Sequence, residues 1–139
     1  MDSFRLRSFA AEFEFRGLNP SDDGHCIFYA SNSENDAEYR HVATGFHIVG
    51  EGNLDISVQS GTQENLAISP VDISATNTIR LLVLGDQIIV LKNGQLMFTV
   101  LEPRIRTVYT HMTFAASHKI DCEYDNFKVW DLSGVDFNP

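Results

Sequence analysis

The sequence predicts an all-β domain, folded as a two-sheet antiparallel β-sandwich of the jelly-roll kind. Almost every apolar stretch repeats with a period of two residues or is a short β-branched run, as in strands. No window of about 11 residues carries the i, i+3, i+4, i+7 pattern of an amphipathic helix. Turn residues recur about every 8–12 residues, a spacing that favours sandwiches and jelly rolls over mixed folds.

The strands follow from this alternation. Phe13 and Phe15 alternate with Glu12, Glu14 and Arg16, which predicts a half-buried strand with a charged outer face. We expect the strands, in chain order, at Phe9–Arg16, His25–Ala30, Tyr39–Val49, Leu54–Gln59, Thr78–Leu84, Gln87–Lys92, Gln95–Val100, Tyr109–Ala115 and Ile120–Trp130.

The segments between these strands carry turn signals. Asn93-Gly94 separates two apolar runs and predicts a tight hairpin, because a type I′ turn needs positive φ at both central residues. Asp125-Asn126 interrupts an apolar strand and predicts a bulge or corner. Ser60–Ala75, which includes Pro70, is expected to be a looser stretch.

Length and charge narrow the function. The chain has 139 residues and a formal net charge of −9, which suits one acidic domain. We place the jelly roll at residues 1–132 and a tail or linker at 133–139. Lys and Arg are too few and too scattered for a phosphate backbone, so no nucleic-acid partner is expected. No apolar run reaches the ~18–20 residues that span a bilayer, so no membrane insertion is expected.

The two cysteines, Cys26 and Cys122, have no metal-ligand or redox-motif spacing. A disulfide between them stays open, but two buried thiols are the favoured interpretation, because free cysteine is among the most buried residue types.

Four short motifs suggest a family. They are NTIRL (77–81), GDQI (85–88), NGQL (93–96) and YDNFKVW (124–130). Their order resembles the concanavalin A-like lectin/glucanase superfamily, and within it laminin-G-like jelly rolls and bacterial domains related to 3-keto-disaccharide hydrolases. The resemblance extends to the G-x-x-F-R pattern of an early strand, where Phe28 occupies the Phe position and Tyr29 replaces the Arg.

The resemblance implies a ligand-binding sheet face. Sugars bind such faces by stacking on aromatic rings while polar side chains take the hydroxyl groups. The alternative is an ordinary exposed strand face. The residues expected on the concave face are Tyr29, His47, Arg80, Tyr109 and His111. Trp130 is expected to anchor the sandwich edge instead.

Two sets of carboxylates lie at strand spacing: Glu12/Glu14 and Asp121/Glu123/Asp125. Residues two apart in a strand share a face at about 6.5–7 Å, a separation that suits acid/base catalysis. A solvent-facing strand is the simpler interpretation of both. Some laminin-G-like domains hold Ca²⁺, and the second set, with Asp22 and Asp23, could do the same through hard oxygen ligands. We nevertheless expect no cofactor.

The resemblance implies a non-catalytic module that binds carbohydrate or another extracellular ligand, as part of a larger bacterial surface or signalling protein. Because no signal peptide is visible, we expect a domain excised from an extracellular or cell-surface chain, with a cytoplasmic protein as the alternative. One alternative function is a glycoside-cleaving enzyme of the 3-keto-disaccharide hydrolase type, although residues 45–48 (GFHI) offer His47 where its acidic motif would lie. The other is a structural sandwich that forms homo-oligomers.

Overall fold

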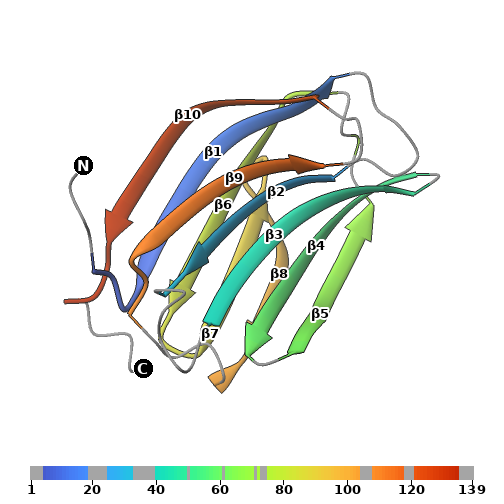
Figure 1. The fold of residues 1–139 in the computed structure, drawn as a ribbon. Helices are drawn as coiled ribbons and strands as arrows, with labels where there is room; N and C mark the ends of the chain where they lie inside the picture. The colour runs from blue at the N-terminus through green and yellow to red at the C-terminus, as the bar shows by residue number, and fades with distance from the viewer. Residues whose placement is uncertain are drawn as a thin grey trace.

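Two antiparallel five-stranded sheets pack face to face (Figure 1). The computed structural model describes residues 5–18, 25–32, 40–49, 51–60, 62–70, 72, 75–103, 108–117 and 121–134. The β1 sheet has the strand order β10-β1-β6-β7-β8, and the β2 sheet has the order β5-β4-β3-β2-β9. The strands are β1 (Phe9–Leu18), β2 (His25–Ser31), β3 (Arg40–Val49), β4 (Glu51–Ser60), β5 (Thr62–Pro70), β6 (Asn77–Leu84), β7 (Gln87–Lys92), β8 (Gln95–Leu101), β9 (His111–Ser117) and β10 (Asp121–Asp131). The predicted sandwich is confirmed.

The core lies between the two sheets and follows the alternation in the sequence. In β1 the four residues Phe9, Ala11, Phe13 and Phe15 are fully buried, whereas the residues between them point outward or are less buried. The ring of Phe13 contacts the rings of Phe28, Phe114 and Tyr124, at centroid distances of 5.2–6.0 Å. Phe114 in turn contacts Phe28 at 5.0 Å and Tyr124 at 4.5 Å. An aromatic cluster therefore joins the two sheets.

The hairpin predicted at Asn93-Gly94 is confirmed. The φ angles are 52° and 82°, so both central residues adopt the left-handed conformation that the turn requires. The Asn93 side chain adds two bonds: its Oδ1 accepts from the backbone N–H of Thr78 at 2.8 Å, and its Nδ2 donates to Asn77 Oδ1 at 3.1 Å. The turn is thereby fastened to the start of β6.

The predicted bulge in the last strand is also confirmed. The register between β1 and β10 shifts between Glu12 and Glu14: Glu14 pairs with Asp125 and Glu12 with Lys128, so Asn126 and Phe127 lie opposite one residue of β1. Asn126 has a φ of 53°, and its backbone N–H donates to Asp125 Oδ1 at 2.8 Å. The short polar side chain satisfies a donor that the interrupted ladder releases.

The expectation of a loose stretch at Ser60–Ala75 is wrong for most of its length. Residues 62–70 form β5, which pairs with β4 at the edge of the β2 sheet. Pro70 stands at the end of this edge strand, one of the few strand positions that tolerate a proline.

The expectation of two free thiols is wrong as well. Cys26 in β2 and Cys122 in β10 form a disulfide with a Cα–Cα distance of 5.9 Å, within the normal range. The two residues are 96 positions apart in sequence and belong to different sheets. Burial is common to free and bonded cysteine, so burial alone could not distinguish the two states.

The two ends of the described chain are joined by hydrogen bonds. Ser133, which the sequence assigned to the tail, accepts at Oγ from the backbone N–H groups of Arg7 at 2.9 Å and Ser8 at 3.2 Å. The backbone N–H of Leu132 donates to Ser8 O at 3.0 Å. Among the described residues, no helix has the length and apolar character needed to cross a bilayer.

Candidate functional site

The five predicted site residues lie in three different places: on the β2 sheet, on the β1 sheet and, for Tyr109, just before β9. Tyr29 in β2, His47 in β3 and His111 in β9 belong to the β2 sheet, whereas Arg80 in β6 belongs to the β1 sheet. The five residues therefore do not share one face.

Tyr109 is not on a sheet face at all. It is fully buried, and its ring meets that of Phe9 edge-on with centroids 5.3 Å apart. The expectation that it points away from the core is wrong, because β9 begins only at His111. Tyr109 instead forms an isolated bridge with Leu6, with backbone N–O distances of 2.7 and 2.9 Å. The alternation of β9 does not extend to it.

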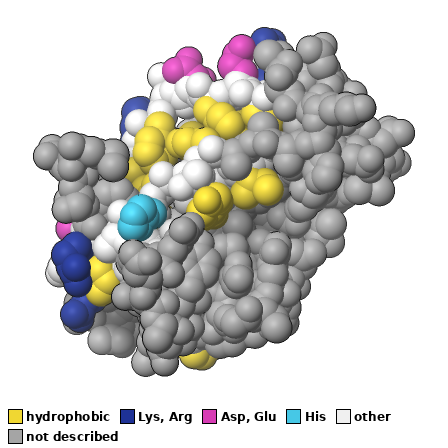
Figure 2. Space-filling view, in the orientation of Figure 1, with side chains coloured by type: hydrophobic (Ala, Val, Ile, Leu, Met, Phe, Trp, Pro, Cys, Tyr) yellow, Lys and Arg dark blue, Asp and Glu magenta, His cyan; other side chains and the backbone are white. Residues whose placement is uncertain are grey.

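Tyr29 and His111 come together on the outer face of the β2 sheet. In β2, Cys26, Phe28 and Ala30 are fully buried, and Tyr29 lies on the opposite, half-buried side. His111 is exposed, and its Nδ1 lies 2.8 Å from Thr110 Oγ1. Figure 2 is seen from this side and shows a histidine side chain near a band of hydrophobic ones.

The register between strands gives the spacing of this face. His111 pairs with Ser31, and Tyr29 pairs with Thr113, so Tyr29 and His111 lie in neighbouring rows. His47 pairs with His25, four residues and about 13 Å along β2 from Tyr29.

By register a different histidine is nearer. His41 pairs with Ser31 on one side and with Gln59 on the other, which extends the row of His111 across β3 and β4. Sequence reasoning missed this position because it considered one strand at a time. The signal that finds it is the pairing between strands.

The fourth predicted residue, Arg80, lies on the outer face of the opposite sheet. Its Nε and Nη2 both donate to Glu12 Oε1, at 3.2 and 2.9 Å. Its guanidinium carbon lies 5.4 Å from the centroid of the Trp130 ring, close enough for a cation–π contact. Trp130 lies in β10, the edge strand of this sheet, and is 40% exposed. The expectation that it anchors the sandwich edge stays a prediction.

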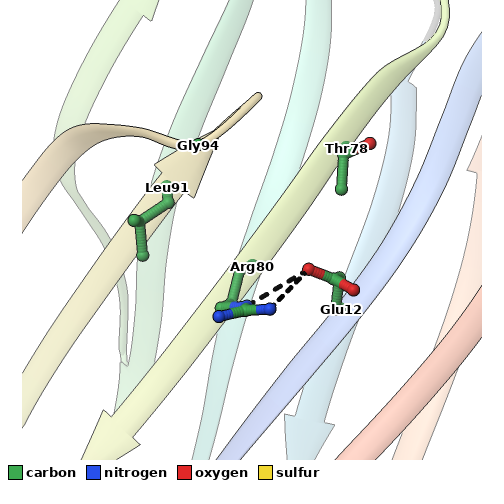
Figure 3. A pocket seen from close by; sticks show the side chains of 5 residues that line it. All are labelled: Glu12, Thr78, Arg80, Leu91 and Gly94. Carbon is green, nitrogen blue, oxygen red and sulfur yellow. Dashed lines mark hydrogen bonds and ion pairs between the residues drawn. The ribbon is translucent and has the colours of Figure 1, made fainter.

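A cavity of about 240 Å³ opens beside this ion pair. It is lined by residues of β1, β6, β7 and the turn after β7: Glu12, Thr78, Arg80, Leu91 and Gly94. Figure 3 shows Arg80 and Glu12 pointing toward one another along one edge, with Thr78, Leu91 and Gly94 around the rest. Glu12 pairs with Arg80 and Arg80 with Leu91, so three of the five residues form one row across the sheet.

Tyr124 lies between the sheets, and its hydroxyl donates to Ile27 O at 3.4 Å. Burial raises the pKa of this phenol far above its usual value of 10.0. Tyr124 therefore stays protonated in the folded protein and supports the core, with no role as a general base.

The comparisons with known proteins agree on one architecture. A carbohydrate-binding module, CBM66 from Bacillus subtilis, superimposes with a TM-score of 0.69 at 11% identity, covering 91% of this chain and 76% of that one. A human galectin-16 variant gives a TM-score of 0.60 at 13% identity, with 94% and 91% covered. The chain has the concanavalin A-like lectin/glucanase fold. A β-glucanase from Bacillus licheniformis shares it, with a TM-score of 0.56, 11% identity, and 96% and 57% covered. No family model matches the chain. No curated protein matches it either.

Glycoside cleavage on a lectin/glucanase fold needs two carboxyl groups placed for acid/base work. Of the carboxylates considered from the sequence, Glu12 is bound by Arg80, Glu123 lies 3.6 Å from Arg16, and Asp125 accepts from its own neighbour in the bulge. These contacts are consistent with structural roles for Glu12, Glu123 and Asp125.

A calcium site finds no support in the described part of the chain, where no three His, Cys, Asp or Glu residues lie close enough to hold a metal. Asp22 and Asp23 lie outside the described residues. The expectation that the domain has no cofactor therefore stays a prediction.

Proposed function

We propose that this domain is a non-catalytic module that binds carbohydrate on the outer face of the β2 sheet, around Tyr29 and His111. The observation that carries the proposal is their placement in neighbouring rows of β2 and β9, on one face of one sheet. A half-exposed aromatic ring can stack on the apolar face of a sugar, and the polar groups beside it can bind the hydroxyl groups.

The register supports a ligand longer than one ring. His41 continues the row of His111, and His47 belongs to a row about 13 Å away along the strands. A chain of two or three sugar units laid along the strands would pass from Tyr29 toward His47.

The fold and the disulfide support the same proposal. The solved structures of similar fold include a carbohydrate-binding module and galectins. The Cys26–Cys122 disulfide fits an oxidising compartment, so we propose an extracellular or cell-surface location, as part of a larger surface or signalling protein.

The test is a titration of the ¹⁵N-labelled domain with a panel of di- and trisaccharides, in which NMR spectra are recorded at each sugar concentration. The expected result is a saturable shift of the Tyr29 and His111 amide signals for at least one sugar. Tyr29→Ala should lower the affinity for that sugar about 10-fold, since an aromatic contact contributes about 0.5–1.5 kcal/mol beyond the burial of its surface.

Matched variants separate binding from folding. Tyr29→Phe retains the ring and should retain most of the affinity, whereas His111→Ala should weaken binding without changing the melting temperature. If no sugar shifts either signal and the protein elutes as an oligomer on sizing, the module is structural and the proposal is wrong.

A further inference from the structure

We propose that the cavity on the outer face of the β1 sheet is a second ligand site, separate from the β2 sheet, that takes a single neutral sugar ring or a similar polyol. The site is built from Glu12, Thr78, Arg80 and Leu91, with Trp130 beside it. The proposal does not depend on sugar binding around Tyr29, because the two faces belong to different sheets.

The polar groups at the cavity retain binding capacity. An arginine has five N–H donors, and two of those of Arg80 reach the same oxygen, Glu12 Oε1. Among the described residues, the other three donors, Glu12 Oε2 and the Thr78 hydroxyl have no protein partner. Donors and acceptors therefore stand side by side.

This combination matches neighbouring hydroxyl groups. A hydroxyl both donates and accepts, so one can donate to Glu12 Oε2 while its neighbour accepts from Arg80. The ion pair also fixes both side chains before a ligand arrives, which reduces the entropy cost of binding. Figure 3 shows the two groups facing each other at the edge of the cavity.

Charge and size define the class of ligand. The guanidinium of Arg80 and the carboxylate of Glu12 cancel, so a charged ligand gains no net attraction from the pair. The cavity, at about 240 Å³, is below the usual ~300–1,000 Å³ of drug-sized pockets and suits one ring. Leu91 supplies an apolar wall, and an added Cβ at Gly94 would meet nothing within 4 Å, so the entrance beside the turn is open.

Trp130 provides a direct readout. It is the only tryptophan of the chain, and the guanidinium of Arg80 lies over its ring. A ligand that binds Arg80 changes the surroundings of the indole. A ligand bound around Tyr29, on the other sheet, leaves the indole emission unchanged.

The experiment is a tryptophan-fluorescence titration of the intact protein with methyl α-D-mannopyranoside, methyl β-D-galactopyranoside and methyl β-D-fructofuranoside. We expect a saturable change in emission with at least one of the three. Glu12→Gln and Thr78→Val should each lower the affinity for that sugar about 5-fold, the effect of losing one hydrogen bond. Arg80→Met should abolish the signal.

Glu123→Gln is the matched control. It disrupts a different ion pair, Arg16–Glu123, which joins β1 to β10 at 3.6 Å and does not line the cavity. It should leave the titration unchanged, as should Tyr29→Ala. A titration with no saturable change for any of the three glycosides overturns the second site. An affinity that is unchanged in Glu12→Gln, together with a signal that persists in Arg80→Met, overturns it as well. A loss of binding in Tyr29→Ala measured by NMR, with normal Trp130 titrations, concerns the first site alone.

Discussion

Cys26 and Cys122 link two strands that have no backbone ladder in common. Cys26 lies in β2, whose neighbours are β3 and β9, and Cys122 lies in β10 at the edge of the other sheet. Elsewhere the two sheets meet through side chains such as those of Phe13 and Phe28. The disulfide is therefore a covalent link between layers that are otherwise joined by packing and by contacts such as the hydrogen bond from the Tyr124 hydroxyl to Ile27 O.

Reduction of this bond should destabilise the fold. A cross-link that closes about 100 residues is worth up to ~4.7 kcal/mol by loop entropy, and removal of native disulfides typically costs about 2–5 kcal/mol. We expect a loss in that range in urea unfolding with and without reductant. The chain has only two cysteines, so Cys26→Ala/Cys122→Ala is a clean control whose stability should not respond to reductant.

Phe13 should be among the most sensitive core positions. It is fully buried and contacts three rings, so Phe13→Ala should lower the free energy of unfolding by about 3–5 kcal/mol. Phe127 is 44% exposed although it also touches two of these rings, so Phe127→Ala should cost less, about 1 kcal/mol. Equal losses in chemical denaturation would contradict the burial of Phe13.

Two glycines test the hairpin geometry. Gly94 has a φ of 82°, which an L side chain rarely adopts, so Gly94→Ala should cost about 1 kcal/mol and lower the melting temperature by a few degrees. Gly134 has no positive φ, and an added Cβ there meets nothing within 4 Å. Gly134→Ala should therefore melt like the parent protein, and a comparable loss at both positions would refute the explanation by φ.

Alkaline pH should unfold the protein in part through Tyr124. Its pKa is raised by burial in the folded state, so the unfolded chain releases the proton first. The stability that this phenol contributes is complete below pH 10 and is lost as the pH rises above it, by at most about 1.4 kcal/mol per pH unit.

The measurement is the free energy of unfolding in urea between neutral pH and strongly alkaline pH. Tyr124→Phe should show a shallower decline above pH 10 than the parent protein, after any constant offset from the lost hydroxyl. Parallel declines would show that Tyr124 ionises as readily in the folded state as in the unfolded one.

Features encoded within a few residues could be predicted. The core face of β1 follows from alternating phenylalanines, because side chains of a strand point to opposite faces in turn. The hairpin at Asn93-Gly94 and the bulge at Asp125-Asn126 follow from residues that tolerate positive φ. In each case the physical cause lies within the segment itself.

Features that depend on distant pairing could not be predicted. Tyr109 is buried because it meets Leu6 and Phe9, about 100 residues earlier in the chain, and its own neighbours in sequence carry no trace of that contact. Arg80 belongs to the sheet opposite Tyr29, an assignment that requires the strand order. The disulfide likewise depends on two strands that meet only in the folded sandwich.

The bonds of Ser133 to Arg7 and Ser8 have a consequence for protein architecture. The chain enters the sandwich and leaves it at one point, so the domain can be placed within a surface loop of another protein while the two sides of that loop stay close together. The same proximity allows a short linker to join the two ends and new termini to be opened elsewhere, for example at the exposed Asn93-Gly94 turn. Such a circular permutant would leave both sheet faces accessible.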